Sequence, residues 1–459
     1  MSAHDSSAFA RAYAVHPRTG ELHPPAVRIV DLSSNGRGNA LFSNRPIPKG
    51  TVIYTERAAC CTVVSETNGA SSAQPKSCHN CFRSLEQIPS STSTGNWPHS
   101  YLWPSLTASR KPTTLAFDDD TTGSVSIDAL GRIQCTHCHE LFCSLACYKQ
   151  SNPTAFCCCQ LSAVMESVNQ LYRSAQQQPQ AAVLLAIRMF TRLVQEQRKE
   201  NDGATSRKDE LKPQDCTVLE GLCGDASEVQ ALELGLHERL QSDEEGTLTY
   251  VFRLEPVYHA LVKGLALEQQ QQRTFTLNLL QQCAAQAARN GFAFRTQSPF
   301  DTYYASVLRV AGRGSPAHEQ LKTTIAHFLE QQDGKEGSSP QTATASTSGT
   351  APVLQRGMEQ QMQQRFTPDL CALFALTARI NHSCSSNAQV QAQTFVDATM
   401  DLIATQDIPA DTEITISYLP PHSTRQRTST RQKQLQARYL FRCACPLCCN
   451  STVTTTASA

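Results

Sequence analysis

The alternation of apolar and polar residues predicts short strands toward both ends of the chain. Residues 26–64 place β-branched residues between Gly, Pro and Asn turns, a pattern typical of a hairpin meander. A similar pattern returns over residues 388–418, so we expect the two β segments to pair with each other. Between them, residues 161–331 carry many apolar positions at helical spacing, with a break near Pro179. The pattern therefore predicts an α+β fold in which strands from both ends flank a helical middle.

Polar and low-complexity stretches separate these elements. Residues 88–126 are rich in Ser, Thr and Pro and predict a disordered insertion, whereas residues 332–352 have the composition of a linker. Residues 201–228 are polar and predict a loop before a second helical stretch at residues 229–290. At 459 residues, the chain is long enough for two or three domains.

Composition and charge narrow the classes of protein that fit. The chain has 40 basic and 40 acidic residues, so no global positive field favours nucleic-acid binding. It has no apolar run of about 18 residues, and its first residues lack the apolar core of a signal peptide. We therefore expect an intracellular monomer, in the nucleus or the cytoplasm or both, without membrane contact. Its 20 cysteines would then be reduced, and their clustering indicates zinc rather than disulfides.

The first cysteine cluster has the spacing of paired zinc ligands. Two residues separate Cys78 from Cys81 and Cys135 from Cys138, which lets each pair reach one tetrahedral ion at about 2.3 Å. The remaining thiols of this region are Cys143, Cys147, Cys157, Cys158 and Cys159. One ion needs four ligands, so we expect two zinc sites; scattered structural cysteines are the alternative that the paired spacings disfavour. The nearby His79, His137 and His139 have other spacings and are predicted to be surface residues.

A second cluster, "YLFRCACPLCC", supplies the three closely spaced thiols of Cys443, Cys445 and Cys448. A structural zinc needs a fourth ligand, and Cys449 is adjacent to Cys448, from where it would struggle to reach the same ion. We expect the fourth ligand from a distance, and Cys384 in the polar stretch "ARINHSCSSN" is the strongest candidate. The alternative of a nucleophilic Cys384 needs an activating base, and His382 at two residues' distance does not guarantee that contact.

Five segments in this order resemble a known family. They are "NGRGNALF" at residues 35–42, the first cysteine cluster, "RINHSC" at 379–384, "EITISY" at 413–418 and "YLFRCACPLC" at 439–448. Together they resemble SET-domain protein-lysine methyltransferases with a MYND zinc-finger insertion, similar to the fungal histone-methylating SET proteins. The resemblance implies a SET β-fold assembled from N- and C-terminal segments. Its parts would be an N-terminal SET segment at 26–64, a MYND-like finger at 78–160, a helical insert at 161–331, a linker at 332–352, the C-terminal SET core at 353–420 and a post-SET zinc segment at 429–449.

The resemblance also implies three zinc sites. The first MYND ion would be held by Cys78, Cys81, Cys143 and Cys147. The second would be held by Cys135, Cys138 and two of the last three cysteines, with Cys157 and Cys159 preferred. The family usually has a histidine four residues before the last ligand, where this chain has Ala155. The third ion would join Cys384 to Cys443, Cys445 and Cys448. One further departure is Ser386, where a proline is usual, so this loop is expected to be less rigid.

The reaction implied is methyl transfer from S-adenosylmethionine to a lysine amine, on a histone tail by default. That amine has an ordinary pKa of about 10.4 and must lose a proton before it attacks. Tyr418 would orient the amine, and Tyr439 would line the lysine channel; the structural alternative for Tyr418 is a strand-end tyrosine packed on the core. The cofactor would be held by Arg37, Gly38, Asn39, Asn381, His382 and Phe441. We expect Glu413 to be structural.

Two other functions compete with this one. A catalytically silent chromatin adaptor could use the MYND finger to bind proline-rich peptides, but a degenerate scaffold would be expected to lose some of Asn39, Asn381, His382 and Tyr418. A DNA-binding zinc-finger protein fits neither the zero net charge nor the cysteine spacings. The sequence therefore favours the enzyme.

Overall fold

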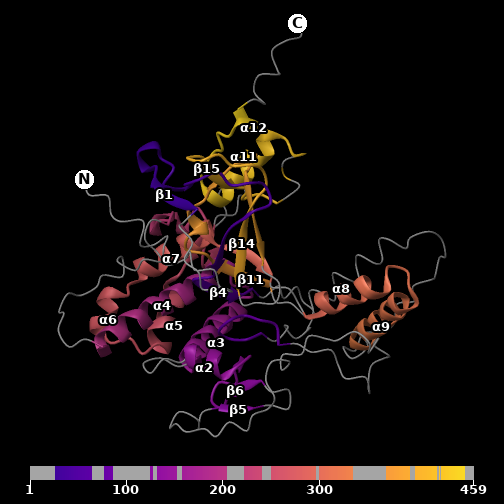
Figure 1. The fold of residues 1–459 in the computed structure, drawn as a ribbon. Coiled ribbons are helices and arrows are strands. Elements are labelled where there is room, and N and C mark those ends of the chain that lie inside the picture. Colours follow the sequence, from indigo (N-terminus) through magenta and orange to yellow (C-terminus); the bar gives the residue numbers. More distant parts are fainter. Residues whose placement is uncertain are drawn as a thin grey trace.

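The computed structural model is a mixed helix and sheet protein (Figure 1). It describes residues 26–64, 77–85, 125–127, 132–151, 158–203, 222–239, 250–295, 299–333, 369–392, 398–420, 423 and 425–449. The predicted insertion at 88–126 and linker at 332–352 lie almost entirely outside the described residues. No helix among the described ones is long and apolar enough to cross a membrane.

Strands from the two ends of the chain pair with each other, as the alternation predicted. One sheet has the order β1-β2-β15-β12, a second β13-β14-β3 and a third β10-β11-β4. The bounds are β1 Val27–Asp31, β2 Asn39–Ser43, β3 Val52–Arg57, β4 Cys60–Val63, β10 Phe292–Arg295, β11 Asp369–Leu373, β12 Asn381–His382, β13 Ala388–Ala392, β14 Thr399–Ala404 and β15 Glu413–Ile416. Figure 1 shows the indigo N-terminal strands among the orange and yellow C-terminal ones.

The register of these sheets buries one face of each strand. Leu41 pairs with Ile414 across β2 and β15, and both are fully buried in the core of the terminal sheets. Leu402 pairs with Tyr54 across β14 and β3 and joins the same core. Because successive side chains of a strand point to opposite faces, this register turns the polar residues of the same strands outward. The pairing of β2 with β15 thereby joins strands from the two ends of the chain in one sheet.

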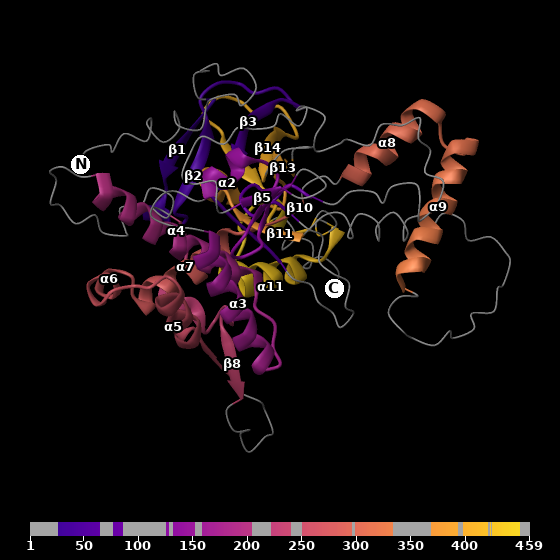
Figure 2. The same cartoon turned by 90° about the horizontal axis from the view of Figure 1, so that it is seen from below.

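The helical middle packs against the third sheet. Helix α3 spans Cys158–Ser174 and α4 spans Ala181–Gly203, separated near Pro179 as predicted. They are followed by α5 Glu255–Gly264, α6 Gln269–Thr274 and α7 Leu277–Asn290, of which α5 and α7 share one buried core with α3 and α4. Helices α8 Pro299–Ala311 and α9 Pro316–Asp333 contact each other and lie to one side (Figure 2).

The prediction of a continuous helical stretch over 229–290 is wrong at its start. Strands β8 Leu236–Arg239 and β9 Tyr250–Arg253 form an antiparallel hairpin there, preceded by a short 3₁₀ turn at Ala226–Val229. The ring of His237 lies 5.3 Å from that of Tyr250 and 5.8 Å from that of Phe252. Cross-strand aromatic contacts of this kind stabilise a hairpin that helical periodicity does not reveal.

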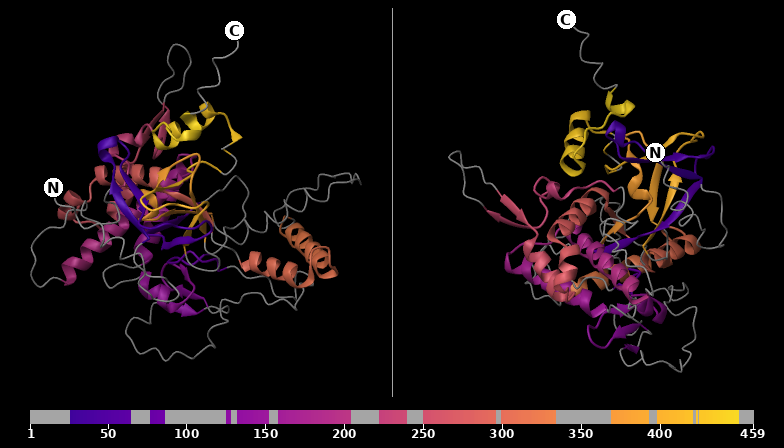
Figure 3. Two further views of the ribbon diagram at one scale, coloured as in Figure 1. Left: turned by 45° about the horizontal axis from the view of Figure 1, so that its top comes forward. Right: turned by 90° about the vertical axis from the view of Figure 1, so that its left-hand side faces the viewer.

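The two cysteine-rich regions lie at opposite ends of the molecule. The first contains β5 Val125–Ile127, β6 Ile133–Cys135, β7 Leu141–Phe142 and α2 Leu145–Ser151. The second contains α11 Thr428–Tyr439 and α12 Pro446–Cys449. Both views in Figure 3 show the yellow C-terminal helices at one end and the magenta insertion at the other. Any zinc in the first region is therefore remote from the C-terminal segment.

Candidate functional site

A cavity of about 640 Å³ lies between the terminal sheet, the C-terminal segment and the end of α7. This volume is in the range of small-molecule sites. All the residues predicted for catalysis and cofactor binding line it, namely Arg37, Gly38, Asn39, Asn381, His382, Tyr418, Tyr439 and Phe441. They come from three distant parts of the sequence, and the strand pairing brings them together.

A tight turn between β1 and β2 forms one wall of the cavity. Gly36 has φ +68° and Gly38 has φ +65°, a region that favours glycine. The backbone N–H of Leu32 donates to the carbonyl of Gly38 at 2.7 Å and closes the turn. The turn therefore brings Arg37 and Asn39 to the cavity wall, and Gly38 between them has no side chain.

Glu413 joins two of the predicted cofactor residues. Its Oε1 accepts a hydrogen bond from Arg37 at 2.5 Å and from Nδ2 of Asn381 at 3.0 Å. Its side chain is 19% exposed and lines the cavity. We expected Glu413 to be structural, and its contacts hold two of the predicted cofactor residues at the cavity.

Tyr418 is half-buried and lines the cavity. Its hydroxyl donates to the carbonyl oxygen of Ile380 at 2.5 Å, and burial raises the pKa of this hydroxyl well above its usual value. The backbone N–H of Tyr418 donates to Nδ1 of His382 at 3.0 Å. Because Nδ1 accepts, Nε2 of His382 carries the proton and faces Sγ of Cys384 at 3.2 Å. Burial, with a contribution from Arg431, lowers the pKa of His382 to about 4.

Aromatic rings from the C-terminal segment close the cavity above Tyr418. The ring of Tyr439 lies 4.8 Å from that of Tyr418, and that of Phe441 lies 6.5 Å from Tyr439. Leu440 between them has φ +58°, a left-handed conformation that ends α11 and turns the chain. The turn places both rings of this segment on the same side, over the cavity.

A buried carboxylate supports the segment that leads into the site. Oε1 of Glu56 accepts from the N–H of Leu376 at 2.7 Å, and Oε2 accepts from the N–H and the hydroxyl of Thr377 at 2.9 and 2.7 Å. These bonds hold the 3₁₀ turn Thr377–Arg379, immediately before Ile380. Burial raises the pKa of Glu56. Sequence reasoning missed Glu56, since nothing in a strand pattern marks a buried acid.

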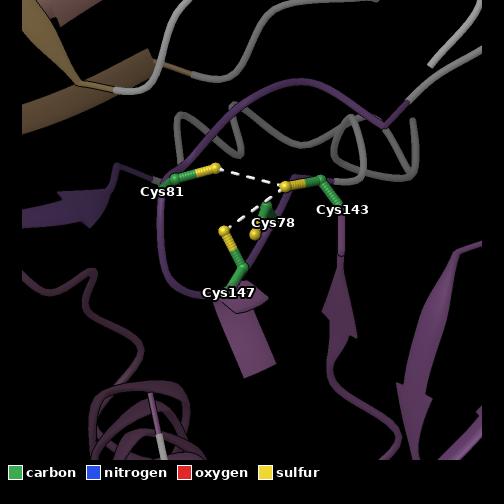
Figure 4. Close-up of side chains that lie close together, drawn as sticks. All are labelled: Cys78, Cys81, Cys143 and Cys147. Carbon is green, nitrogen blue, oxygen red and sulfur yellow. Dashed lines mark hydrogen bonds between the residues drawn. The ribbon is translucent and has the colours of Figure 1, made fainter. Parts of the chain in front are cut away.

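Three groups of four thiols converge among the described residues. They are Cys78, Cys81, Cys143 and Cys147; Cys135, Cys138, Cys158 and Cys159; and Cys384, Cys443, Cys445 and Cys448. Contacts within the groups measure 3.4 to 4.0 Å between sulfurs. Four sulfurs around one zinc ion lie about 3.8 Å apart when each Zn–S bond is about 2.3 Å. Figure 4 shows the first group, with Cys143 in contact with Cys81 and Cys147. All three donor sets therefore fit zinc.

The second group contains Cys158 where the sequence preferred Cys157. Cys158 and Cys159 open helix α3, and their sulfurs lie 3.4 Å from Cys138 and 3.7 Å from Cys135. Cys157 lies outside the described residues. Adjacent cysteines at the start of a helix can thus share one group. In the third group the exposed Cys449 stays outside, as predicted.

The prediction that His79 is a surface residue is wrong. His79 is 9% exposed, and its Nδ1 lies 3.2 Å from Oε2 of Glu140. Its ring also lies 5.6 Å from that of Phe142, which belongs to the buried core of the first cysteine cluster. His137 and His139 are exposed, as expected.

The helical middle contributes residues to the cavity that the sequence did not identify. Arg289 and Asn290 end α7 and line the cavity together with Cys223. Arg289 forms an ion pair with Glu228 at 2.7 Å, and Nδ2 of Asn290 donates to the carbonyl of Cys223 at 2.6 Å. No sequence pattern predicts that these residues reach the cavity, because their position depends on how helix α7 packs against the rest of the protein.

Comparison with known proteins matches the SET domain family model to residues 38–419, most of the chain. The chain is 43% identical over 83 residues to the histone-lysine N-methyltransferase ASHR1 of Arabidopsis thaliana, covering 18% of this chain and 16% of that one. It is 39% identical over 82 residues, 18% of this chain and 16% of the other, to SET domain and MYND-type zinc finger protein 6 of Schizosaccharomyces pombe. It is 34% identical over 97 residues, 21% and 22% of the two chains, to the protein-lysine N-trimethyltransferase SMYD5 of Gallus gallus. The aligned part thus spans about a fifth or less of these relatives.

Proposed function

The chain belongs to the SET-domain family, and from this premise we propose that it is an S-adenosylmethionine-dependent protein-lysine N-methyltransferase. The observation that carries the proposal is the convergence of Arg37, Asn39, Asn381, His382 and Tyr418 on one cavity. These residues lie on segments separated by more than 340 positions of sequence, and the pairing of β15 with β2 and with β12 unites them.

S-adenosylmethionine would supply an electrophilic methyl group on a sulfonium. Toward it, the glycine turn at Gly36 and Gly38 offers backbone that a ligand can approach closely. Asn381 and His382 would hold its amino-acid end, and Phe441 would pack on its adenine. Glu413 fixes Arg37 and Asn381 relative to each other, so these donors need no rearrangement on binding.

Tyr418 and Tyr439 would serve the lysine. Burial keeps the Tyr418 hydroxyl protonated at neutral pH, because its pKa is raised. A neutral hydroxyl and the adjacent backbone carbonyls can orient an amine without adding charge beside it. The rings of Tyr418 and Tyr439 would exclude water from the amine, which favours its neutral, attacking form. Holding donor and acceptor in line then provides most of the acceleration.

Zinc would hold the cysteine groups. We assign two ions to the predicted MYND-like insertion, through the Cys78 and Cys135 groups, and one to the post-SET segment, through the Cys384 group. The last ion would join "RINHSC" to the segment carrying Tyr439 and Phe441. Zinc there would therefore keep the cavity closed and would take no part in the methyl transfer itself.

The substrate would be a protein lysine, with a histone tail as the first candidate. This assignment rests on relatives named histone-lysine N-methyltransferase in plant and yeast species, and it implies action in the nucleus. The bird relative is named a protein-lysine N-trimethyltransferase, so non-histone proteins belong in the test as well. Binding of proline-rich peptides by the insertion and a monomeric state remain predictions.

The test is transfer of labelled methyl groups from S-adenosylmethionine to core histones and to whole-cell lysate. We expect label on at least one protein and on lysine after digestion. The silent-adaptor function predicts no labelled protein in either mixture. Label on arginine or on nucleic acid would contradict the proposed reaction.

A further inference from the structure

A second cavity, of about 370 Å³, lies between α3, α4 and strand β4. Its apolar wall includes Val63, Met165 and Leu184, and its polar wall includes Asn169 and Arg188. It belongs to a different set of elements from the cavity around Tyr418, and the two share no lining residue. It is therefore a separate site.

The cavity is lined by Arg188, whose side chain has no polar partner among the residues that the structure describes. Its Nε is buried without a hydrogen-bond partner, and its guanidinium makes no hydrogen bond or ion pair among the described residues. One face of the guanidinium lies 5.0 Å from the centre of the Phe82 ring, which fixes the group in place. A buried guanidinium nitrogen without an acceptor is costly, since native proteins pair such groups almost always.

The neighbouring acids do not fill this role. Burial lowers the pKa of Arg188, and Cys61 and Glu140 oppose that lowering. The oxygens of Glu140, however, already face His79 at 3.2 Å and Ser162 at 2.9 Å. Glu166 on the cavity wall pairs with Arg173 at 2.5 Å. The two arginines and one acid on the wall leave an excess of positive charge at Arg188. The missing partner is thus an anion from outside this part of the chain.

The apolar wall and strand β4 indicate which anion fits. A carboxylate that reaches Arg188 would bring its neighbouring atoms against Val63, Met165 and Leu184, so an apolar group beside the acid is favoured. In the described sheet β4 is an edge strand, and its Thr62 and Val63 line the cavity. Edge strands bind extended peptides through their backbone groups. An acidic side chain followed by an apolar one on a peptide meets each of these conditions.

We propose that this cavity binds a peptide segment of a partner protein that carries a carboxylate side chain next to an apolar one, with the carboxylate paired to Arg188. The guanidinium can donate to both carboxylate oxygens in a paired, charge-assisted arrangement. Because Phe82 follows Cys81, the occupied site would contact the loop of the first cysteine group. The site is independent of the proposed methyl transfer.

The test uses the full chain and two matched dipeptides, acetyl-Glu-Val-amide and acetyl-Gln-Val-amide. The chain has only six methionines, so ¹³C-methyl labelling gives a small NMR spectrum in which Met165→Leu identifies the Met165 signal. We expect the Glu peptide to shift the Met165 signal at about 1 mM. The Gln peptide should bind about tenfold more weakly or worse, since it loses a charge-assisted hydrogen bond.

Variants at Arg188 complete the test. Arg188→Met should weaken the Glu peptide to the level of the Gln peptide, and Arg188→Lys should retain part of the difference. If Arg188→Met does not fold, Arg188→Lys and the two peptides on the native chain decide. Equal binding of the two peptides, unchanged binding by Arg188→Met, or no shift of Met165 would each overturn the proposal. A shift with inorganic phosphate and none with the Glu peptide would also overturn it, in favour of a phosphate site.

Discussion

The backbone N–H of Tyr418 donates to Nδ1 of His382 at 3.0 Å, which fixes the imidazole with its other nitrogen toward Cys384. His382 therefore contacts the proposed catalytic tyrosine on one side and a proposed zinc ligand on the other. The short stretch "NHSC" joins the cavity to the C-terminal cysteine group in two residues. Because of this relationship, we expect the third zinc site to affect the activity of the protein as well as its stability.

Loss of Cys384 should open the cavity. Cys384→Ser removes one of four thiols, so we expect the zinc content to fall by one ion per chain and the affinity for S-adenosylmethionine to fall about 10- to 100-fold. Elemental analysis and calorimetric titration measure the two quantities. Cys449→Ser is the matched control, because Cys449 is exposed and outside the group. A Cys384→Ser protein with full zinc content and native affinity would contradict the shared site.

The second cysteine group can be tested by position. We expect three zinc ions per native chain, and two after Cys158→Ser, because Cys158 lies with Cys135, Cys138 and Cys159. Cys157→Ser should keep three. The opposite result for the two neighbouring variants would restore the ligand set expected from the sequence alone.

Glu413 should matter for the cofactor through Arg37. Glu413→Gln keeps the shape of the side chain but removes its charge from an ion pair that is 46% and 19% exposed. A partly exposed pair contributes about 1 kcal/mol, so affinity for S-adenosylmethionine should fall about fivefold. Asp411→Asn removes an acid from the surface pair with Arg28 and should leave the affinity unchanged. Equal effects of both substitutions would argue against a role of Glu413 in the cavity.

Glu56 should give the stability a defined pH dependence. Burial raises its pKa in the folded chain above that of the unfolded chain, about 4.3. Protonation of Glu56 therefore favours folding; this contribution is fully present below the unfolded pKa and is lost as the pH rises through the folded pKa. In urea unfolding, the free energy of the native chain minus that of Glu56→Gln should decrease over this rise. Glu166→Gln, an exposed carboxylate, serves as control. A difference that grows with pH would show that the hydrogen bonds from Leu376 and Thr377 outweigh burial.

Residue order predicted the family and most of the cavity, because those features depend on local motifs. The five segments around Arg37, Cys78, Asn381, Tyr418 and Cys443 identify the SET-domain family, and the family model bears this out. The strands and the α3–α4 break followed from periodicity and Pro179.

What the sequence did not reveal depends on packing between distant elements. The burial of His79 against Glu140, the network through Glu413, and the approach of Arg289 to the cavity each need partners that no spacing specifies. The β8–β9 hairpin was missed because apolar positions in a short, aromatic strand resemble those of a helix. The choice among Cys157, Cys158 and Cys159 stayed open because the position four residues before Cys159, where the family usually has a histidine, holds Ala155.

The most direct test of the central claim measures cofactor affinity and methyl-transfer rate in parallel for Tyr418→Phe. Tyr54→Phe is the matched control, since it also removes a buried hydroxyl that contacts a neighbour, at 2.9 Å from Thr377, but it lies outside the cavity lining. We predict that Tyr418→Phe lowers the transfer rate about 100-fold or more while S-adenosylmethionine affinity changes less than tenfold, and that Tyr54→Phe retains the native rate. An unchanged rate in Tyr418→Phe, or bound cofactor with no methyl transfer by the native chain to any protein, would contradict it.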